Sequence, residues 1–432
     1  MAETDLTKMT SAELVEALIK DNSIASEFDR LNLWGKFYPW DWCNLLSAQP
    51  QLWIYCPEES VNKIKEDPTN ANECECWEEF EDWNWCDLLS AQPQFTDKCT
   101  EYNGWEKFCS YNWSDLLSSQ PQFTEKAKEY SHGWAGLLSI KPELANEYKC
   151  WEKFDSSDWC YLLSSQPQFA DKCTEYNGWG KFDSWDWLEL LSAQSQFADK
   201  CTEYKVWDAF DSWKWCDLLS SQPQLADKCT EYNAWEEFFP GVWSILLESQ
   251  PQFIEKAKEY SHGWVGLLSI KPELANECEC WEKFSSSDWS NLLKAQPQFA
   301  DKCDKWREFD SWVWSNLLKS QPQFADKCTE YKGWEKFCYS DWFNFLSSQP
   351  QFTEKAKEYS HGWARLLSIK PELANECECW EKFDFDDWSE LLYYQPQFAD
   401  KCPDKIYDEF SQGEWAKLEA KHPGVFEDKH TL

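Results

Sequence analysis

One pattern recurs along almost the whole chain: a tryptophan followed three and four positions later by two apolar residues, in most copies Leu-Leu. We call this tryptophan the anchor. A motif that recurs fifteen times at intervals of mostly 20 to 30 residues is the signature of a stacked repeat array. The anchors are Trp42, Trp85, Trp113, Trp134, Trp159, Trp187, Trp215, Trp243, Trp264, Trp289, Trp314, Trp342, Trp363, Trp388 and Trp415.

Each unit is predicted to hold two short helices. The anchor and its Leu-Leu pair share one helical face, and Ser or Asp often precedes them at a capping position. Proline stands eight positions after the anchor in 14 of the 15 units, where it ends the first helix and suits the start of a second. Phe299, Cys303, Trp306 and Phe309 then fall at i, i+4, i+7 and i+10, which predicts one continuous apolar stripe on that second helix.

The intervals between anchors favour helices over strands. Apart from a first interval of 43 and a last of 27, they are 21, 25 or 28 residues, so unit lengths differ by whole helical turns. The predicted fold is an all-α solenoid, a superhelix of about fifteen stacked two-helix repeats of 21, 25 or 28 residues with a long concave surface.

Three segments follow from the pattern. We expect an N-terminal capping repeat over residues 1–37, a helical-hairpin array over 38–402 with an inserted loop at 53–76, and a C-terminal capping repeat over 403–432. In the first segment Thr10 and Glu13 have the spacing of a capping box. In the last, Glu419 and Lys429 replace apolar residues of the pattern, which predicts a polar outer face.

This layout resembles tandem helical-hairpin repeat proteins, and the unit DWxxLLxxQPQFADKC is similar to Trp- and Leu-rich repeats of uncharacterised bacterial proteins. The resemblance covers nearly the whole chain and implies the same all-α architecture. The unit lacks the signature residues of tetratricopeptide and ankyrin repeats, so the resemblance implies no activity and no functional residue.

Charge restricts the class of partner. The chain holds 41 Lys and Arg against 78 Asp and Glu, a net charge of −37, which disfavours direct binding to nucleic acid or to an anionic membrane. A protein with a basic surface is the expected partner. No stretch of 18 apolar residues occurs, and the first residues, MAETDLTKMT, lack the pattern of a signal peptide, so we expect a cytoplasmic protein.

Some aromatic residues stand where a core residue is not expected. The position two before the anchor holds Trp in five units, but also Ser, His, Asp or Gly in others, and it does not share the anchor's helix face. Two interpretations remain open: an exposed recognition surface, or local packing over the turn between helices. The candidate partner-binding residues are Trp40, Trp83, Tyr111, Trp185, Trp213 and Trp312, of which Trp185 and Trp213 belong to adjacent units.

The cysteines are predicted to be reduced core residues. Their number, 21, is odd, and ten occupy the position 14 after the anchor, where Ala127, Ala257 and Ala356 stand in other units. Cys-x-Cys pairs at 74/76, 278/280 and 377/379 offer soft metal ligands, but no histidine is near them in sequence. We therefore predict no metal site.

Catalysis is not expected. His132, His262 and His361 share the context Tyr-Ser-His-Gly-Trp, which we interpret as a turn whose glycine caps the preceding helix. The chain has no phosphate loop, nucleophile elbow, zinc-protease helix or dinucleotide fingerprint. We predict no catalytic residues and no cofactor.

The function most consistent with these features is a non-enzymatic repeat scaffold that binds a basic protein. An alternative is an acidic mimic of nucleic acid that occupies the groove of a DNA- or RNA-binding enzyme, because the array has about one net charge per 3 Å, close to the roughly 3.4 Å of a single nucleic-acid strand. A glycan or peptide binder that uses exposed tryptophan is a third reading. The charge also has a simple explanation in keeping a Trp-rich array in solution.

Overall fold

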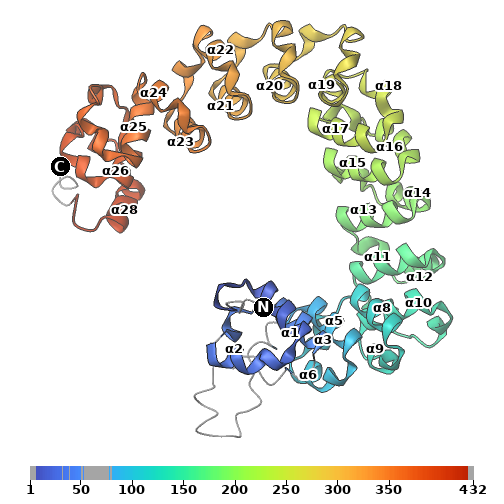
Figure 1. The fold of residues 1–432 in the computed structure, drawn as a ribbon. Helices are drawn as coiled ribbons and strands as arrows, with labels where there is room; N and C mark the ends of the chain where they lie inside the picture. Colours follow the sequence, from blue (N-terminus) through green and yellow to red (C-terminus); the bar gives the residue numbers. More distant parts are fainter. Residues whose placement is uncertain are drawn as a thin grey trace. The chain divides into compact units, whose positions relative to one another are not determined.

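The computed structural model describes residues 6–31, 33–37, 39–49, 52, 77 and 80–426, and all the regular secondary structure in these ranges is helical. The predicted all-α solenoid of stacked repeats is therefore confirmed. The chain forms two compact units, Met1–Tyr232 and Asn233–Leu432, which Figure 1 distinguishes by the blue-to-green and yellow-to-red colours of the chain. The expected loop at 53–76 and Lys429 lie outside the described residues.

Each described repeat begins with an α-helix of ten residues, which we call the first helix. Its fourth residue is the anchor tryptophan, or Leu14 in α1. In the N-terminal unit the first helices are α1 (Ser11–Lys20), α3 (Pro39–Ala48), α5 (Asp82–Ala91), α8 (Ser110–Ser119), α10 (Ser131–Ile140), α11 (Ser156–Ser165), α13 (Ser184–Ala193) and α15 (Ser212–Ser221). In the C-terminal unit they are α17 (Pro240–Ser249), α19 (Ser261–Ile270), α20 (Ser286–Ala295), α21 (Ser311–Ser320), α23 (Tyr339–Ser348), α25 (Ser360–Ile369), α26 (Phe385–Tyr394) and α28 (Gln412–Lys421).

Side-chain caps fix where many first helices begin. The Asp183 carboxylate accepts hydrogen bonds from the backbone N–H groups of Trp185 and Asp186, at 2.7 and 3.0 Å. The Asp186 carboxylate in turn accepts from the Asp183 N–H at 2.9 Å, which completes a capping box. The capping box predicted from Thr10 and Glu13 is confirmed in α1.

The second half of the repeat is not the continuous helix that we predicted. A 3-10 turn at the Pro-Gln-Phe sequence leads into a short helix, and a separate turn at Trp-x-x-Phe follows. Between Phe299 and Phe309 the chain forms η20 (Pro297–Lys302) and η21 (Trp306–Glu308), and Cys303 between them is extended. The apolar spacing is kept, but the Trp-x-x-Phe turn moves away to cover the next first helix.

Short α-helices occupy the second halves of many repeats. They are α2 (Ala25–Leu31), α6 (Thr96–Glu101), α7 (Gly104–Lys107), α9 (Thr124–Ala127), α12 (Ala170–Glu175), α14 (Ala198–Glu203) and α16 (Ala226–Glu231) in the N-terminal unit. In the C-terminal unit they are α18 (Ile254–Ala257), α22 (Ala325–Glu330), α24 (Thr353–Ala356) and α27 (Asp404–Tyr407).

The 3-10 turns complete the repeats. In the N-terminal unit they are η1 (Leu6–Lys8), η2 (Asn22–Ile24), η3 (Trp34–Lys36), η7 (Pro93–Phe95), η8 (Pro121–Phe123), η9 (Pro142–Asn146), η10 (Trp151–Lys153), η11 (Pro167–Phe169), η12 (Gly178–Lys181), η13 (Ser195–Phe197), η14 (Trp207–Ala209) and η15 (Pro223–Leu225). In the C-terminal unit they are η16 (Ala234–Glu237), η17 (Pro251–Phe253), η18 (Pro272–Asn276), η19 (Trp281–Lys283), η20, η21, η22 (Pro322–Phe324), η23 (Gly333–Lys336), η24 (Pro350–Phe352), η25 (Pro371–Asn375), η26 (Trp380–Lys382) and η27 (Pro396–Lys401).

Stacked tryptophans form the centre of most repeats. The tryptophan of each Trp-x-x-Phe turn lies parallel to the next anchor, as in Trp179 on Trp187, with ring centroids 5.5 Å and planes 15° apart. The phenylalanine of the same turn meets that anchor edge-on, as Phe182 does at 5.3 Å and 69°. These rings are mostly buried, and they hold the second half of one repeat against the first helix of the next.

A row of glutamines joins the ends of neighbouring first helices. The glutamine that follows a first helix donates its side-chain Nε2–H to a backbone carbonyl in the last turn of the preceding first helix, a group with no partner within its own helix. We call these bonds the Gln ladder. It comprises Gln49 to Ile19, Gln92 to Ser47, Gln120 to Ser90, Gln166 to Ser139, Gln194 to Ser164 and Gln222 to Ser192 in the N-terminal unit, and Gln296 to Ser269, Gln321 to Lys294, Gln349 to Lys319 and Gln395 to Ser368 in the C-terminal unit, all at 2.5–2.9 Å.

Among the described residues, five other than glycine have a left-handed backbone: Asn103, Asn177 and Asn233 with φ of 53°, and Lys205 and Lys332 with φ of 56°. Asparagine adopts this conformation more readily than lysine. We predict that Lys332→Asn raises the free energy of unfolding by about 0.5–1 kcal/mol, measured by urea denaturation. Lys128→Asn is the control, because Lys128 has φ of −65°, and an equal gain there would contradict the explanation.

Candidate functional site

The aromatic residues two positions before the anchor, at the second position (N2) of the first helices, are exposed wherever their side chains are described. Their exposed fractions range from 46% to 61%, while the anchors close to them are buried. The side chains are therefore exposed, as the first interpretation requires, and recognition of a partner through them stays a prediction. These exposed residues, which we call the N2 aromatics, are Trp83, Tyr111, Trp185, Trp213 and Trp312; the side chain of Trp40 lies outside the described part of the chain.

Neighbouring first helices run parallel within each unit, so the N2 aromatics of one unit lie along one edge. The Gln ladder joins C-terminal ends, and contacts between N2 of one helix and N3 of the next join N-terminal ends. The N-terminal unit carries Trp83, Tyr111, Trp185 and Trp213, and the C-terminal unit carries Trp312.

Some of the N2 aromatics already contact a neighbour. The Lys214 ammonium lies 4.3 Å from the ring centroid of Trp185, and the Lys294 ammonium lies 5.9 Å from that of Trp312. Tyr111 meets Tyr161 edge-on at 6.3 Å. The ring faces at this edge are therefore suited to cations, as the electron-rich face of an indole is in general.

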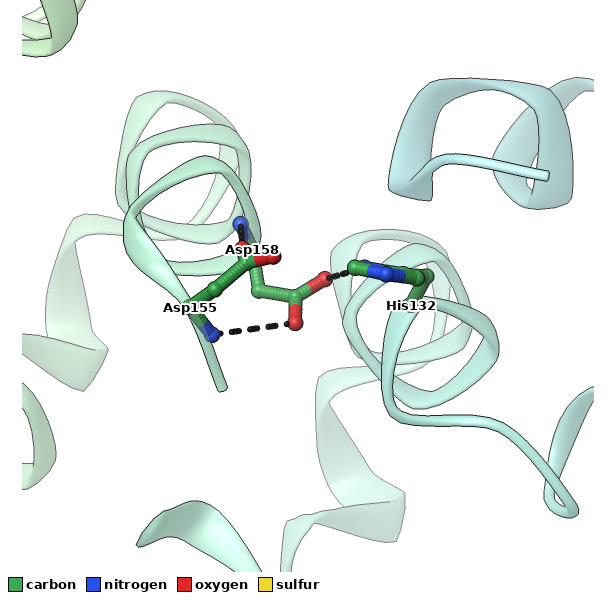
Figure 2. Close-up of side chains that lie close together, drawn as sticks. All are labelled: His132, Asp155 and Asp158. Carbon is green, nitrogen blue, oxygen red and sulfur yellow. Dashed lines mark hydrogen bonds and ion pairs between the residues drawn. The ribbon is translucent and has the colours of Figure 1, made fainter. Parts of the chain in front are cut away.

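Histidine at the same N2 position makes a different contact, which the sequence did not reveal. The Nδ1 atom of His132 in α10 lies 2.7 Å from a carboxylate oxygen of buried Asp158 in α11, as Figure 2 shows. Asp158 also accepts hydrogen bonds from the Ser110 hydroxyl at 2.6 Å and from the Asp155 N–H at 3.3 Å. The cluster joins three consecutive first helices of the N-terminal unit.

Two further copies repeat the histidine–aspartate contact in the C-terminal unit. His262 lies 2.6 Å from Asp288, and His361 lies 2.9 Å from Asp387. The three histidines each precede their aspartate by 26 residues, and this repeated spacing is the signal in the sequence from which the pairs could have been found.

These clusters have the residue composition of a metal site, but their hydrogen bonds clamp two neighbouring helices together. One histidine and two aspartates approach one another at His132 and at His361. In the second copy Ser285 takes the place of Asp155: its hydroxyl caps the helix, as the Asp155 carboxylate does, and it also donates a hydrogen bond to the Asp288 carboxylate at 2.8 Å. What the three copies share is the tie between two helices, not a set of three ligands.

The glycine after each histidine does not cap a helix, contrary to our prediction. Gly133 lies within α10, and a Cβ atom there would stand 2.1 Å from the carbonyl oxygen of Ala127; Gly263 and Gly362 repeat this arrangement. Glycine is required because the first helix approaches the backbone of the preceding short helix too closely for a side chain.

The aspartates raise the pKa of His132, His262 and His361 above the usual 6.5, mainly through these hydrogen bonds and against an opposing effect of burial. A pKa that is higher in the folded chain means that the pairs stabilise the fold fully below about pH 6.5, and that this stabilisation is lost as the pH rises through the raised values.

We predict that the wild-type protein loses stability relative to the triple variant His132→Asn, His262→Asn, His361→Asn as the pH rises from about 6 to 9. The asparagine amide keeps a hydrogen-bond donor but does not titrate. Each pair should contribute about 0.5–1 kcal/mol, because solvent screens these half-exposed rings. Urea unfolding at a series of pH values measures the difference, and parallel profiles for the two proteins would contradict the assignment.

In the described part of the chain, the cysteines 14 positions after the anchor are buried, which confirms the core interpretation for them. Cys99, Cys173, Cys201, Cys229 and Cys328 are fully enclosed, as are Ala127, Ala257 and Ala356 in the same position. Burial raises the pKa of Cys173 and Cys201 to about 12, so these thiols stay protonated. The sulfur atoms of the Cys278/Cys280 and Cys377/Cys379 pairs lie 3.7 and 3.6 Å apart as free thiols.

We predict that iodoacetamide at about pH 8 alkylates exposed Cys338 in the native protein well before it alkylates Cys173 or Cys201. The thiolate is the reactive form, and the two core thiols are both covered and hard to ionise. Peptide mass spectrometry over a time course measures the rates. The three cysteines are expected to react at equal rates only when the protein is unfolded in urea. Equal alkylation rates in the native protein would contradict the core assignment.

The C-terminal unit also has an open cleft of about 710 Å³ between α26 and α28. Its aromatic wall is covered from within, because the Lys421 ammonium lies 3.5 Å from the ring centroid of Tyr393 and 4.5 Å from that of Tyr394. Glu390 and Glu414 also line it, but histidine and cysteine do not.

The fold and the repeat place the chain in the class of all-α solenoid repeat proteins. Comparisons with protein families, curated proteins and solved structures find no match to it. Within the described ranges, every helix is too short or too polar to cross a membrane.

Proposed function

We propose that this protein is a non-enzymatic cytoplasmic scaffold that binds a protein partner with a basic surface through the N2 aromatics. The observation that carries the proposal is their exposure: large rings stand at one position on parallel helices, in a fold whose other described tryptophans are buried or partly buried. Exposed tryptophan and tyrosine concentrated on one edge are the residue types that dominate protein interfaces.

The net charge of −37 supports a basic partner. Opposite charge accelerates the encounter of two proteins, while buried aromatic anchors slow their dissociation. Free thiols throughout the described residues are consistent with a reducing compartment such as the cytoplasm.

A second candidate is a mimic of nucleic acid that inhibits a DNA- or RNA-binding enzyme. The charge favours it, since the acidic residues are distributed along the whole array. The two candidates differ in their dependence on salt. A mimic binds by charge and loses most of its affinity as salt rises, whereas an interface anchored by tryptophan retains much of it.

We predict that Trp185→Ala with Trp213→Ala lowers partner retention by about 10–100-fold in a pull-down from source lysate, because exposed rings of this kind act as binding hot spots. The double variant should keep the wild-type unfolding midpoint, since both rings are largely exposed. Retention is quantified by mass spectrometry at about 0.15 M and 1 M salt.

The matched control is Ile369→Ala, which removes an exposed apolar side chain outside the N2 position. Loss of the partner at high salt from the wild-type protein, with no effect of the tryptophan variant, would replace the scaffold proposal with the mimic. A partner retained equally by all variants would remove the N2 aromatics from the interface.

A further inference from the structure

Four of the N2 aromatics are followed one helical turn later by an acidic residue. The pairs are Trp83 with Asp87, Tyr111 with Asp115, Trp185 with Glu189, and Trp213 with Asp217. All four belong to first helices of the N-terminal unit, namely α5, α8, α13 and α15. Residues at i and i+4 share a helix face, so each pair offers a ring and a carboxylate side by side.

The contacts of these residues agree with the spacing. The Asp115 carboxylate on the same helix raises the pKa of the Tyr111 hydroxyl, through hydrogen bonding and charge. Partial burial and the nearby charge of Asp115 raise the pKa of Asp87, so carboxylates on adjacent first helices interact with one another. The pairs on α5 and α8 therefore form one continuous surface. We call these two pairs, together with the pairs on α13 and α15, the ring–carboxylate face.

Two rows of acidic residues in the N-terminal unit differ in their partners. In the short helices Glu101, Glu175, Glu203 and Glu231 each form an ion pair with the lysine three residues earlier, at 2.7–3.0 Å. On the ring–carboxylate face, Asp87, Asp115, Glu189 and Asp217 are exposed, and within the described part of the chain none forms such a pair. The second row is thus the one that remains to bind a cation.

The chain itself shows how a cation fits this chemistry. The Lys214 ammonium lies 4.3 Å from the Trp185 ring centroid and 3.2 Å from a carboxylate oxygen of Asp211. A ring face and a carboxylate hold one ammonium between them. Cation–π attraction and a neighbouring carboxylate reinforce each other, and a planar guanidinium stacks on such a ring better than an ammonium does.

We propose that the ring–carboxylate face binds an extended arginine- and lysine-containing segment of a partner protein. The proposal rests on the function proposed above and names the chemistry of its partner. Each ring covers the face of one cationic group, and the carboxylate one turn along the helix pairs with its charge. Adjacent first helices lie about 8–10 Å apart, which an extended chain spans with about three residues, so cations at every third position match the neighbouring helices.

The C-terminal unit provides an internal contrast. Its N2 aromatic, Trp312, is followed one turn later by Asn316 instead of an acidic residue. Arg365 stands at the position of the missing carboxylate in α25. Exposed tryptophan without the acidic partner is present there, so the two requirements can be separated experimentally.

The probe is a fluorescent peptide of about twelve residues with arginine at every third position and Gly or Ser between. It is long enough to cross about four helices, so one peptide reaches either the pairs on α5 and α8 or those on α13 and α15, which α10 and α11 separate. Its affinity for the full chain is measured by anisotropy at about 0.15 M salt. We expect Asp87→Asn, Asp115→Asn, Glu189→Gln and Asp217→Asn together to weaken binding at least 10-fold. Trp83→Ala with Trp213→Ala should have a similar effect, and Trp312→Ala should have almost none.

The charge-matched control is Glu101→Gln, Glu175→Gln, Glu203→Gln and Glu231→Gln, which removes the same four charges from the paired row of the same unit. We expect it to change the affinity less than threefold, with the unfolding midpoint of each variant compared to show that the fold is kept. Equal losses in the two quadruple variants would overturn the proposal, because the peptide would then sense only the overall charge. Binding unaffected by the tryptophan variants would overturn it as well.

The peptide experiment and the pull-down test different proposals, so either one can be contradicted while the other is supported. Wild-type protein that binds the peptide with the expected variant pattern, but retains no protein from the lysate, would support the face and contradict the scaffold function. A partner retained through Trp185 and Trp213, together with no peptide binding, would support the scaffold and overturn the ring–carboxylate face as its cation site.

Discussion

The fold depends on the stacking of one tryptophan on another. A ten-residue helix with a short broken segment behind it cannot enclose a core by itself, and each repeat completes its core with the first helix of the next. The parallel rings of Trp179 and Trp187 make that connection, and Phe182 closes its edge. Large flat rings are suited to such thin layers, because each buries about 150–250 Å² while it constrains few torsions.

The same stacking has a cost that the structure tolerates. The Trp179 indole N–H donates to the Thr174 hydroxyl at 2.9 Å, but the N–H groups of the anchors Trp159 and Trp187 are buried without an acceptor in the described chain. A buried donor of this kind costs about 1–3 kcal/mol. That the arrangement recurs along the array indicates that the packing of the rings outweighs this loss at each repeat.

Sequence predicted what is local and periodic. The anchors, their capping residues and the Cys or Ala at the core position were recognisable because each belongs to one helix or one fixed register. The second helix was predicted wrongly because Phe299, Cys303, Trp306 and Phe309 keep a helical spacing while Trp306 stacks on the next anchor instead of continuing the helix. The clamp between His132 and Asp158 was missed because it joins two helices 26 residues apart. The mixture of residue types at the N2 position made exposure one of two interpretations of the N2 aromatics. Only the structure showed that these side chains are exposed.

The Gln ladder gives the array a direction. Gln194 binds a carbonyl of the first helix that precedes its own, so the end of each first helix in the ladder receives its hydrogen bond from a residue that follows it in the chain. A ribosome produces these residues in the same order, and a helix that has already emerged remains uncapped until the next repeat has been synthesised. The last turn of such a helix is therefore satisfied only after the following repeat has been made. A nascent chain that stops before that repeat ends in a first helix whose terminal carbonyl lacks its glutamine partner.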